Sequence, residues 1–186
     1  MVEGVDQGDS SRRGRQVLPP DVTPDHVLGL VELLHSLGSG IDSMYVGDAI
    51  SEDVSMLPHA IDVAEALGLI AQREGNLELT ERGRQVARGN PKTVKRLLQE
   101  VVLRLEPFNE IVEKLREKSE MPVEEFEEIL EKVYPTQLEQ AKHNILVWGA
   151  FLGLFKMSED DERIVAIHIP RARETQGRAR GGEHQA

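Results

Sequence analysis

Cysteine is absent from the sequence, which excludes disulfides, thiolate metal sites and cysteine nucleophiles. No run of 18 or more apolar residues occurs, so no transmembrane helix is expected. The first 17 residues are polar and lack the apolar core of a signal peptide. These absences predict a cytoplasmic protein without membrane insertion.

The motifs of common enzymes are missing as well. There is no Gly-x-x-x-x-Gly-Lys-Ser/Thr phosphate loop for ATP and no Gly-x-Ser-x-Gly turn for a serine nucleophile. The six histidines form no His-x-x-x-His zinc motif, and the spacing of Glu139 and His143 fits an ion pair better than half of a metal site. We therefore expect no catalysis, no cofactor and no metal.

Positive charge is scarce in the part of the chain that can fold. Residues 21–170 carry 15 Lys and Arg against 28 Asp and Glu, a net charge of −13. Residues 1–17 and 171–186 are rich in Gly, Ser, Gln, Arg and Glu, and are predicted to be disordered tails. A protein with this charge needs a concentrated basic face to bind DNA.

The folded part is predicted to form two units, residues 18–89 and 90–170. In the first unit, Thr23 is expected to cap a helix that begins at Pro24 and stops at Gly38. The apolar stripe of this helix consists of Val27, Leu30, Val31, Leu34 and Leu37.

Two further helices are expected before the first hairpin. Asp42 caps a short helix over residues 43–50, which turns Met44, Tyr45 and Ala49 or Ile50 inward. After a turn at residues 51–53, a third helix begins near Ser55 with Pro58 in its first turn. Its expected buried residues are Leu57, Ile61, Ala64 and Leu67, and its outward residues are Met56, His59, Asp62, Val63 and Glu65. It is a poor DNA reader, because Lys and Arg are absent between Glu52 and Gln72.

A hairpin follows, with strands expected at residues 69–73 and 77–80 and a turn in which Gly75 and Asn76 supply positive φ angles. Thr80 then caps a helix over residues 81–88. The one basic stretch of the folded chain begins here and comprises Arg82, Arg84, Arg88, Lys92, Lys95 and Arg96. It is either a contact for nucleic acid or an acidic partner, or a solvated helix surface with ion pairs to nearby glutamates.

The second unit is expected to begin at Asn90-Pro91 with a long helix that Pro107 kinks or restarts. A helix after Pro122 has an acidic outer face, and Thr136 caps the last helix. The apolar surface of that helix is wider than a normal stripe because of Leu146, Val147 and Phe151, which are either buried between the units or form an external interface. Lys142 and His143 are its only side chains suited to phosphate.

A helix end followed by a hairpin occurs twice. Leu67-Gly68-Leu69 leads into the first hairpin and Leu152-Gly153-Leu154 into a second, with strands expected at 154–157 and 164–169. This repeat predicts a mainly α fold with small β-hairpins (α+β), built from tandem winged helix-turn-helix units. The tip of the second hairpin, residues 158–163, carries four carboxylates where a DNA-binding wing contacts phosphate.

The chain also resembles a known family. Leu18-Pro19-Pro20, Pro58, Leu67-Gly68-Leu69, Glu78-Leu79-Thr80 with Gly83, and Trp148-Gly149 are together similar to the AAA-associated C-terminal domain, over about residues 18–168. That domain follows the ATP-binding subunit of nitrate, sulfonate and bicarbonate-type ABC transporters and also occurs as stand-alone archaeal proteins. The resemblance implies a regulatory or protein-contacting role and carries over no catalytic residue.

Two hypotheses follow. The first is a noncatalytic, regulatory module that binds a protein, either an ABC transporter ATPase subunit or a second copy of itself. The alternative is a DNA-binding transcription regulator that uses the basic stretch and Lys142. The sequence does not identify the partner, the oligomeric state or the rigidity of the two units. Clustering of the basic stretch with Lys142 in space favours nucleic acid, and scattering favours protein.

Overall fold

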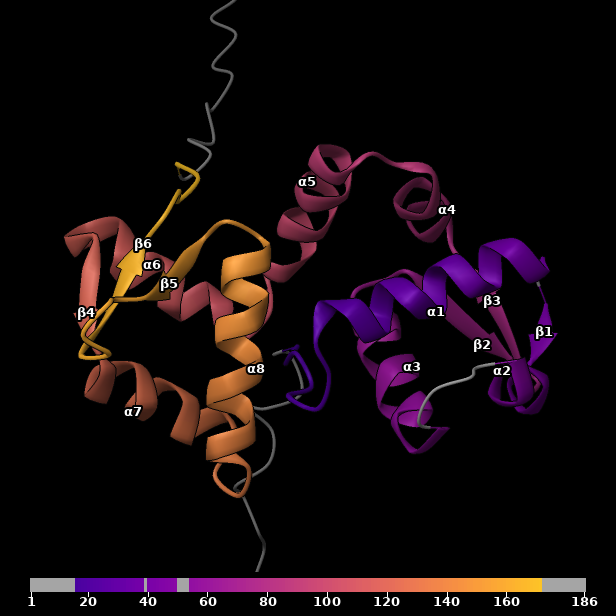
Figure 1. Cartoon of the computed structure of the whole chain (residues 1–186), viewed down its shortest axis with the longest axis horizontal. Coiled ribbons are helices and arrows are strands. Elements are labelled where there is room, and N and C mark those ends of the chain that lie inside the picture. The colour runs from indigo at the N-terminus through magenta and orange to yellow at the C-terminus, as the bar shows by residue number, and fades with distance from the viewer. Residues whose placement is uncertain (1–15, 39, 50–53, 172–186) are drawn as a thin grey trace, which may run out of the picture.

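The computed structural model describes residues 16–38, 40–49 and 54–171 (Figure 1). The greater part of both predicted tails, together with Ile50 and the predicted turn at residues 51–53, lies outside the described residues. Gln16 and Val17, expected in the N-terminal tail, are instead paired with Glu106 by a backbone hydrogen bond and a short bridge. The N-terminal tail expected at residues 1–17 is therefore too long by at least these two residues.

The first half of the chain joins three helices to a small antiparallel sheet. The sheet has the strand order β1-β3-β2, in which β3 lies between its two neighbours. The elements are α1 (Pro24–Leu37), β1 (Ile41–Asp42), α2 (Ser43–Ala49), a 3-10 turn (Val54–Met56), α3 (Leu57–Ala66), β2 (Ile70–Arg73) and β3 (Asn76–Leu79).

The second half repeats this order of elements. Its sheet has the order β4-β6-β5, so the last strand again lies between the other two. The elements are α6 (Phe108–Lys118), β4 (Glu120–Pro122), α7 (Val123–Val133), α8 (Leu138–Phe151), β5 (Phe155–Met157) and β6 (Arg163–Ala166). Two helices, α4 (Glu81–Arg88) and α5 (Pro91–Val102), connect the halves along one side of the molecule (Figure 1). An α+β architecture is confirmed, and the division into units at residue 89 stays a prediction.

Local capping signals fixed several helix boundaries correctly. Helix α1 has Thr23 before Pro24, and the Thr23 hydroxyl bonds to the ring of His26 at 3.0 Å. The Thr80 side chain accepts a hydrogen bond from the Gly83 N–H at 3.0 Å at the start of α4. The expected ends of α1 and α4 are confirmed because short-range chemistry decides them.

The expected inward face of α2 was wrong, whereas the inward residues expected for α3 are buried and only one of its outward residues was wrong. In α2, Met44 is 80% exposed and Tyr45 58% exposed, while Val46 is fully buried. The Met44 N–H binds the Asp42 carboxylate at 2.8 Å, which starts the helix with its first turn toward solvent. In α3, Val63 was expected to point outward but is fully buried, because α3 packs on both α1 and β2.

The structure also differs from the sequence-based expectations at its shortest strands, at the first hairpin and at the start of α8. Of the two expected effects of Pro107, a kink or a restart of the helix, the structure shows the restart, with α5 and α6 separated by residues 103–107. Pro107 lacks an N–H and directly precedes α6. Strands β1 and β4 were not expected, because two or three residues show no alternating pattern. In the first hairpin, the positive φ angles occur at Glu74 and Gly75 instead of Gly75 and Asn76, because Asn76 already belongs to β3. Helix α8 begins after Gln137 instead of after a cap at Thr136.

Residues 16–22 precede α1 in sequence but are bonded to the second half of the chain. The Leu18 N–H binds the Glu106 carbonyl at 2.9 Å, and the hydroxyl of buried Tyr134 donates to the Leu18 carbonyl. Asn144, the one polar residue in the described core, donates its amide to the Pro20 carbonyl at 2.7 Å. This N-terminal segment therefore ties the start of α1 to α8.

Candidate interaction surfaces

Half of the basic stretch is used for internal contacts. The Arg82 guanidinium donates to the Leu97 carbonyl at 3.0 Å and lies 3.7 Å from Glu100, which also pairs with Arg96 at 3.3 Å. The Arg84 guanidinium contacts the Glu81 carboxylate at 2.9 Å and donates to the Leu79 carbonyl. Arg82 links α4 to α5 and Arg84 links α4 to β3, while the Arg96 pair lies within α5, as the alternative of an ion-paired helix surface expects.

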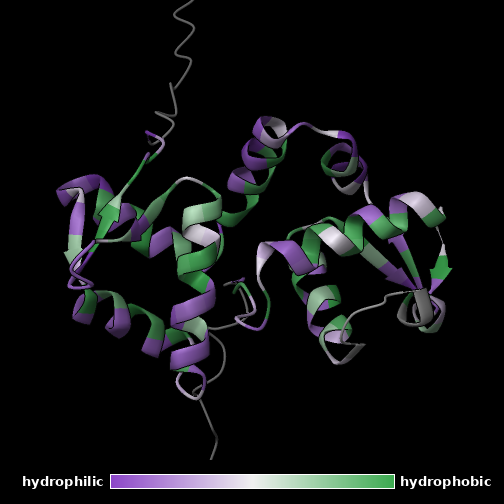
Figure 2. Ribbon diagram, viewed as in Figure 1, coloured by the Kyte–Doolittle hydropathy of each residue, from purple (hydrophilic) through white to green (hydrophobic). Residues whose placement is uncertain are grey.

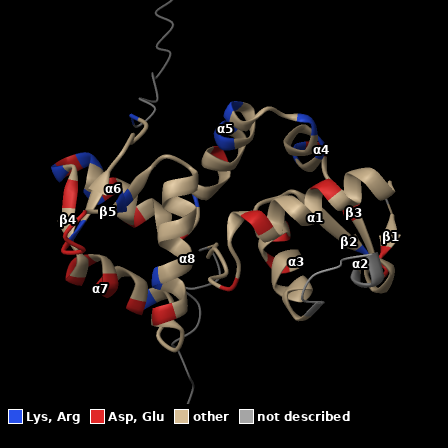
Figure 3. Ribbon diagram, viewed as in Figure 1, with Lys and Arg blue, Asp and Glu red and all other residues tan. Residues whose placement is uncertain are grey.

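The other half of the stretch faces solvent. Arg88, Lys92 and Lys95 are exposed, and no described residue forms an ion pair or hydrogen bond with their side chains. Figure 3 shows Lys and Arg gathered on α4 and α5, whereas Asp and Glu follow α7. We call these three residues the exposed cations.

Lys142 does not join the basic stretch. Its Nζ atom donates to the Glu127 carboxylate at 2.6 Å, and this hydrogen bond raises the pKa of Lys142 above its ordinary value. Helix α5 touches the opposite end of α8, where the Gln99 amide binds the Leu152 carbonyl at 2.6 Å. Ten residues of helix, or about 15 Å, separate these two contacts along α8. The structure thus scatters the cations that the DNA hypothesis needs to be clustered.

The apolar residues proposed for an interface lie on the C-terminal half of α8. Leu146, Val147 and Phe151 are all half-buried, and Leu146 and Phe151 pack against the core. The Phe151 ring meets the indole of Trp148 edge to face, with centroids 6.5 Å apart. Figure 2 shows this end of α8 as hydrophobic and its other end as hydrophilic.

An apolar groove of about 230 Å³ lies beside Phe151, where α1, α4, α5 and α8 meet. Sequence reasoning missed it, because its lining comes from three separate parts of the sequence: α1, the adjacent helices α4 and α5, and α8. Leu28 gave a partial signal as an apolar residue outside the expected stripe of α1. The lining residues are Leu28, Val31, Glu32, Val86, Ala87, Gly89, Pro91, Val94, Lys95 and Phe151.

The tip of the second hairpin is ordered by its own side chains. The Ser158 hydroxyl bonds to the Asp160 carboxylate at 2.5 Å and accepts from the Arg163 N–H at 3.0 Å. The bond from Ser158 lowers the pKa of Asp160 below its usual value. Glu159, Asp161 and Glu162 are exposed, so the tip presents fixed negative charge.

Helix α3 presents no cation to solvent. His59, Asp62 and Glu65 are exposed on it, and the His59 ring lies 3.8 Å from the Asp21 carboxylate. A helix with these side chains offers no Arg or Lys fork for guanine and no cation for phosphate.

A second groove, of about 400 Å³, lies between α6 and the β4–α7 turn. Its walls are glutamates and two lysines, and Lys114 binds Glu125 at 3.0 Å, which raises the pKa of Lys114. No histidine, serine or threonine lines it. Within the described residues, no group of three His, Asp or Glu side chains is placed to hold a metal, and no helix is long and apolar enough to cross a membrane.

Comparison with protein families gives one result. A model of the C-terminal AAA-associated domain matches residues 44–158, from α2 to the end of β5. This is narrower than the expected 18–168 and leaves α1 and β6 outside the match. No curated protein and no solved structure is significantly similar to the chain. Because the match covers more than half of the sequence, the chain belongs to the C-terminal AAA-associated domain family.

Proposed function

We propose that the chain is a noncatalytic tandem winged helix-turn-helix module that binds a protein and regulates it. The observation that carries the proposal is membership of the C-terminal AAA-associated domain family. The repeated order of helix, strand, two helices and hairpin supports the winged-helix part, since each hairpin follows the third helix of its half.

The partner that fits best is an ABC transporter ATPase subunit in the cytoplasm. The family is named for its association with ATPases, and this sequence has no phosphate loop of its own. The chain then acts by binding one state of the ATPase subunit better than another, which shifts the equilibrium between them. A second copy of the chain remains the other candidate partner.

Electrostatics supports protein over DNA. The positions that read DNA in a winged helix are the third helix and the wing, and here α3 lacks cations while the second wing carries exposed carboxylates. Carboxylates facing a phosphate backbone slow encounter and lower affinity.

An affinity-tagged chain, purified at moderate salt from the cells that naturally make it, tests the proposal. The expected result is recovery of an ABC transporter ATPase subunit that survives nuclease treatment. Recovery of the chain as a lone monomer counts against the module as a protein-binding unit.

The second candidate function is a DNA-binding regulator, and the exposed cations Arg88, Lys92 and Lys95 favour it. Anisotropy of a labelled duplex at increasing salt tests it. Three phosphate contacts predict that log K falls with log salt at a slope of about −2.7. If the chain does not bind the duplex even at low salt, this candidate function is removed.

A further inference from the structure

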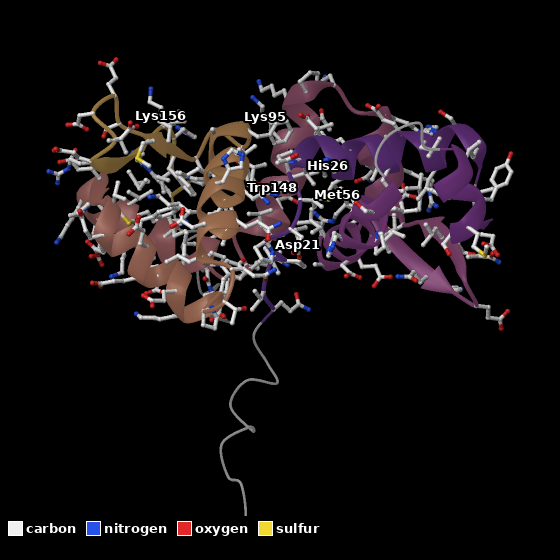
Figure 4. All side chains as sticks on the ribbon, turned by 60° about the horizontal axis from the view of Figure 1, so that its bottom comes forward. Asp21, His26, Met56, Lys95, Trp148 and Lys156 are labelled. Atoms are coloured by element: carbon white, nitrogen blue, oxygen red, sulfur yellow. The ribbon has the colours of Figure 1, made fainter. Side chains whose placement is uncertain are left out.

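The groove between α1, α4, α5 and α8 combines an apolar lining with nearby cations. Most of its walls are apolar, with Leu28 and Val31 from α1, Val86 and Ala87 from α4, and Phe151 from α8. Two charged residues line it, Lys95 and Glu32, and Arg88 and Lys92 directly precede and follow the lining residues Gly89 and Pro91 in sequence, so cations outnumber the single carboxylate around the groove. Figure 4 shows Lys95 at the edge of the molecule, between the two halves.

The size of the groove limits its occupant. Small-molecule sites enclose roughly 300–1,000 Å³, and this groove encloses about 230 Å³. A volume of this kind suits an anchoring apolar side chain from a protein partner, which is the arrangement at the centre of many interfaces. The groove is therefore better matched to a peptide or helix than to a cofactor.

Charge complementarity decides the chemistry of that partner. The three exposed cations have no acidic partner among the described residues, although the protein as a whole carries a net charge of −11. Leaving cations unpaired on an acidic protein keeps them free for carboxylates of another molecule. Phosphate contacts need charge alone, so an apolar cavity that Lys95 lines favours protein over nucleic acid.

We infer that the groove binds an acidic amphipathic helix of the partner protein, an inference that rests on the proposed function. One or two apolar side chains of that helix enter beside Phe151 and Ala87. Its carboxylates face Arg88, Lys92 and Lys95, as in other complexes of an amphipathic helix with an apolar groove. A second copy of the chain is a poorer occupant, since acidic α7 already buries its apolar face, which consists of Val123, Phe126, Ile129 and Leu130.

The test uses the full chain and two labelled 18-residue peptides. Both carry leucine at every third or fourth position, and one has glutamate where the other has lysine. The acidic peptide is expected to bind, with NMR shift changes at Val86, Val94 and Phe151, and the basic peptide is not. Replacing both Lys92 and Lys95 by Glu is expected to weaken binding at least about tenfold. Lys156→Glu, the same type of substitution at one exposed site on β5 with half the charge change of the double variant, is the control and is expected to leave affinity unchanged.

A second variant tests the cavity itself. Ala87 is half-buried and lines the groove, and Ala87→Leu extends its side chain two carbons beyond the methyl group. This substitution leaves the charge unaltered and is expected to weaken binding of the acidic peptide about as much as the charge variant does. Circular dichroism checks its fold, and the charge variants carry the test if it does not fold.

Three outcomes overturn the inference: no binding of the acidic peptide, equal binding of both peptides, or shift changes away from the groove. A DNA duplex that perturbs the groove residues more strongly than the acidic peptide also overturns it. If an ATPase subunit co-purifies equally well with the Lys92→Glu, Lys95→Glu double variant, the groove assignment fails while the proposed function stands.

Discussion

The indole N–H of Trp148 donates a hydrogen bond to the Val22 carbonyl at 2.9 Å, and both residues are buried. Trp148 lies on α8, and Val22 lies two residues before α1. With the bonds from Tyr134 and Asn144, this contact fixes residues 16–22 against the second half. The start of the first half is thereby held by the second.

The first prediction concerns this bond. Trp148→Phe keeps an aromatic ring but removes the donor, so the free energy of unfolding should fall by about 1–3 kcal/mol for the unsatisfied carbonyl, with a further loss for the vacated volume. Urea unfolding measures it. Exposed Tyr45 provides the control, since Tyr45→Phe should change stability by no more than about 0.5 kcal/mol. Equal effects of the two substitutions contradict the role of the bond.

A pair of glycines gives the second prediction. A Cβ at Gly149 lies 2.3 Å from the buried Phe155 ring, so Gly149→Ala should destabilise the fold by about 1–3 kcal/mol. Gly29 in α1 is exposed with nothing within 4 Å, so Gly29→Ala should stabilise it by about 0.5–1 kcal/mol. Thermal or urea unfolding separates the two. Shifts of the same sign show that the packing of α8 on β5 is not as described.

Tyr134 gives a prediction at alkaline pH. Burial, and then the charges of Asp21 and Glu106, raise the pKa of the Tyr134 phenol well above its ordinary 10.0. The folded state keeps a proton that the unfolded state loses above about pH 10, so this contribution to stability declines as the pH rises past 10. The unfolding free energy should therefore fall more steeply from pH 9 to pH 11 in the unmodified protein than in Tyr134→Phe. Parallel curves are the contrary result.

Asp160 gives a prediction at acidic pH, where its contribution to stability changes with pH in the opposite direction to that of Tyr134. The hydrogen bond from Ser158 holds the pKa of Asp160 below 3.8, so its contribution to the hairpin is present above about pH 4 and is lost as the pH falls through the lowered value. A carboxyl NMR titration should show Ser158→Ala moving the midpoint of Asp160 up toward 3.8. An unchanged midpoint indicates that Ser158 does not order the tip.

Local chemistry made much of the fold predictable. Thr23, Thr80 and Asn90 each cap a helix where the sequence placed one, because a cap depends on neighbours within three residues. The failures depend on long-range packing. Val63 is buried because α3 has neighbours on two sides, and Met44 is exposed although it is apolar.

The candidate surfaces were predictable only in part. The basic stretch was visible in the sequence, but the division between paired Arg82 and exposed Lys95 depends on where Leu97 and Glu100 fall in space. The groove beside Phe151 was not visible, since four helices must meet before it exists. The contacts of the N-terminal segment were missed for the same reason, as two of its partners, Tyr134 and Asn144, lie more than 110 residues away.

The central claim is that this member of the C-terminal AAA-associated domain family binds an ATPase subunit through its own surface. Sedimentation velocity of the purified chain mixed with the purified ABC transporter ATPase subunit from the same cells tests it most directly. The account predicts a faster-sedimenting complex that persists at 150 mM salt without nucleic acid. Independent sedimentation of the two proteins, with and without ATP, contradicts it.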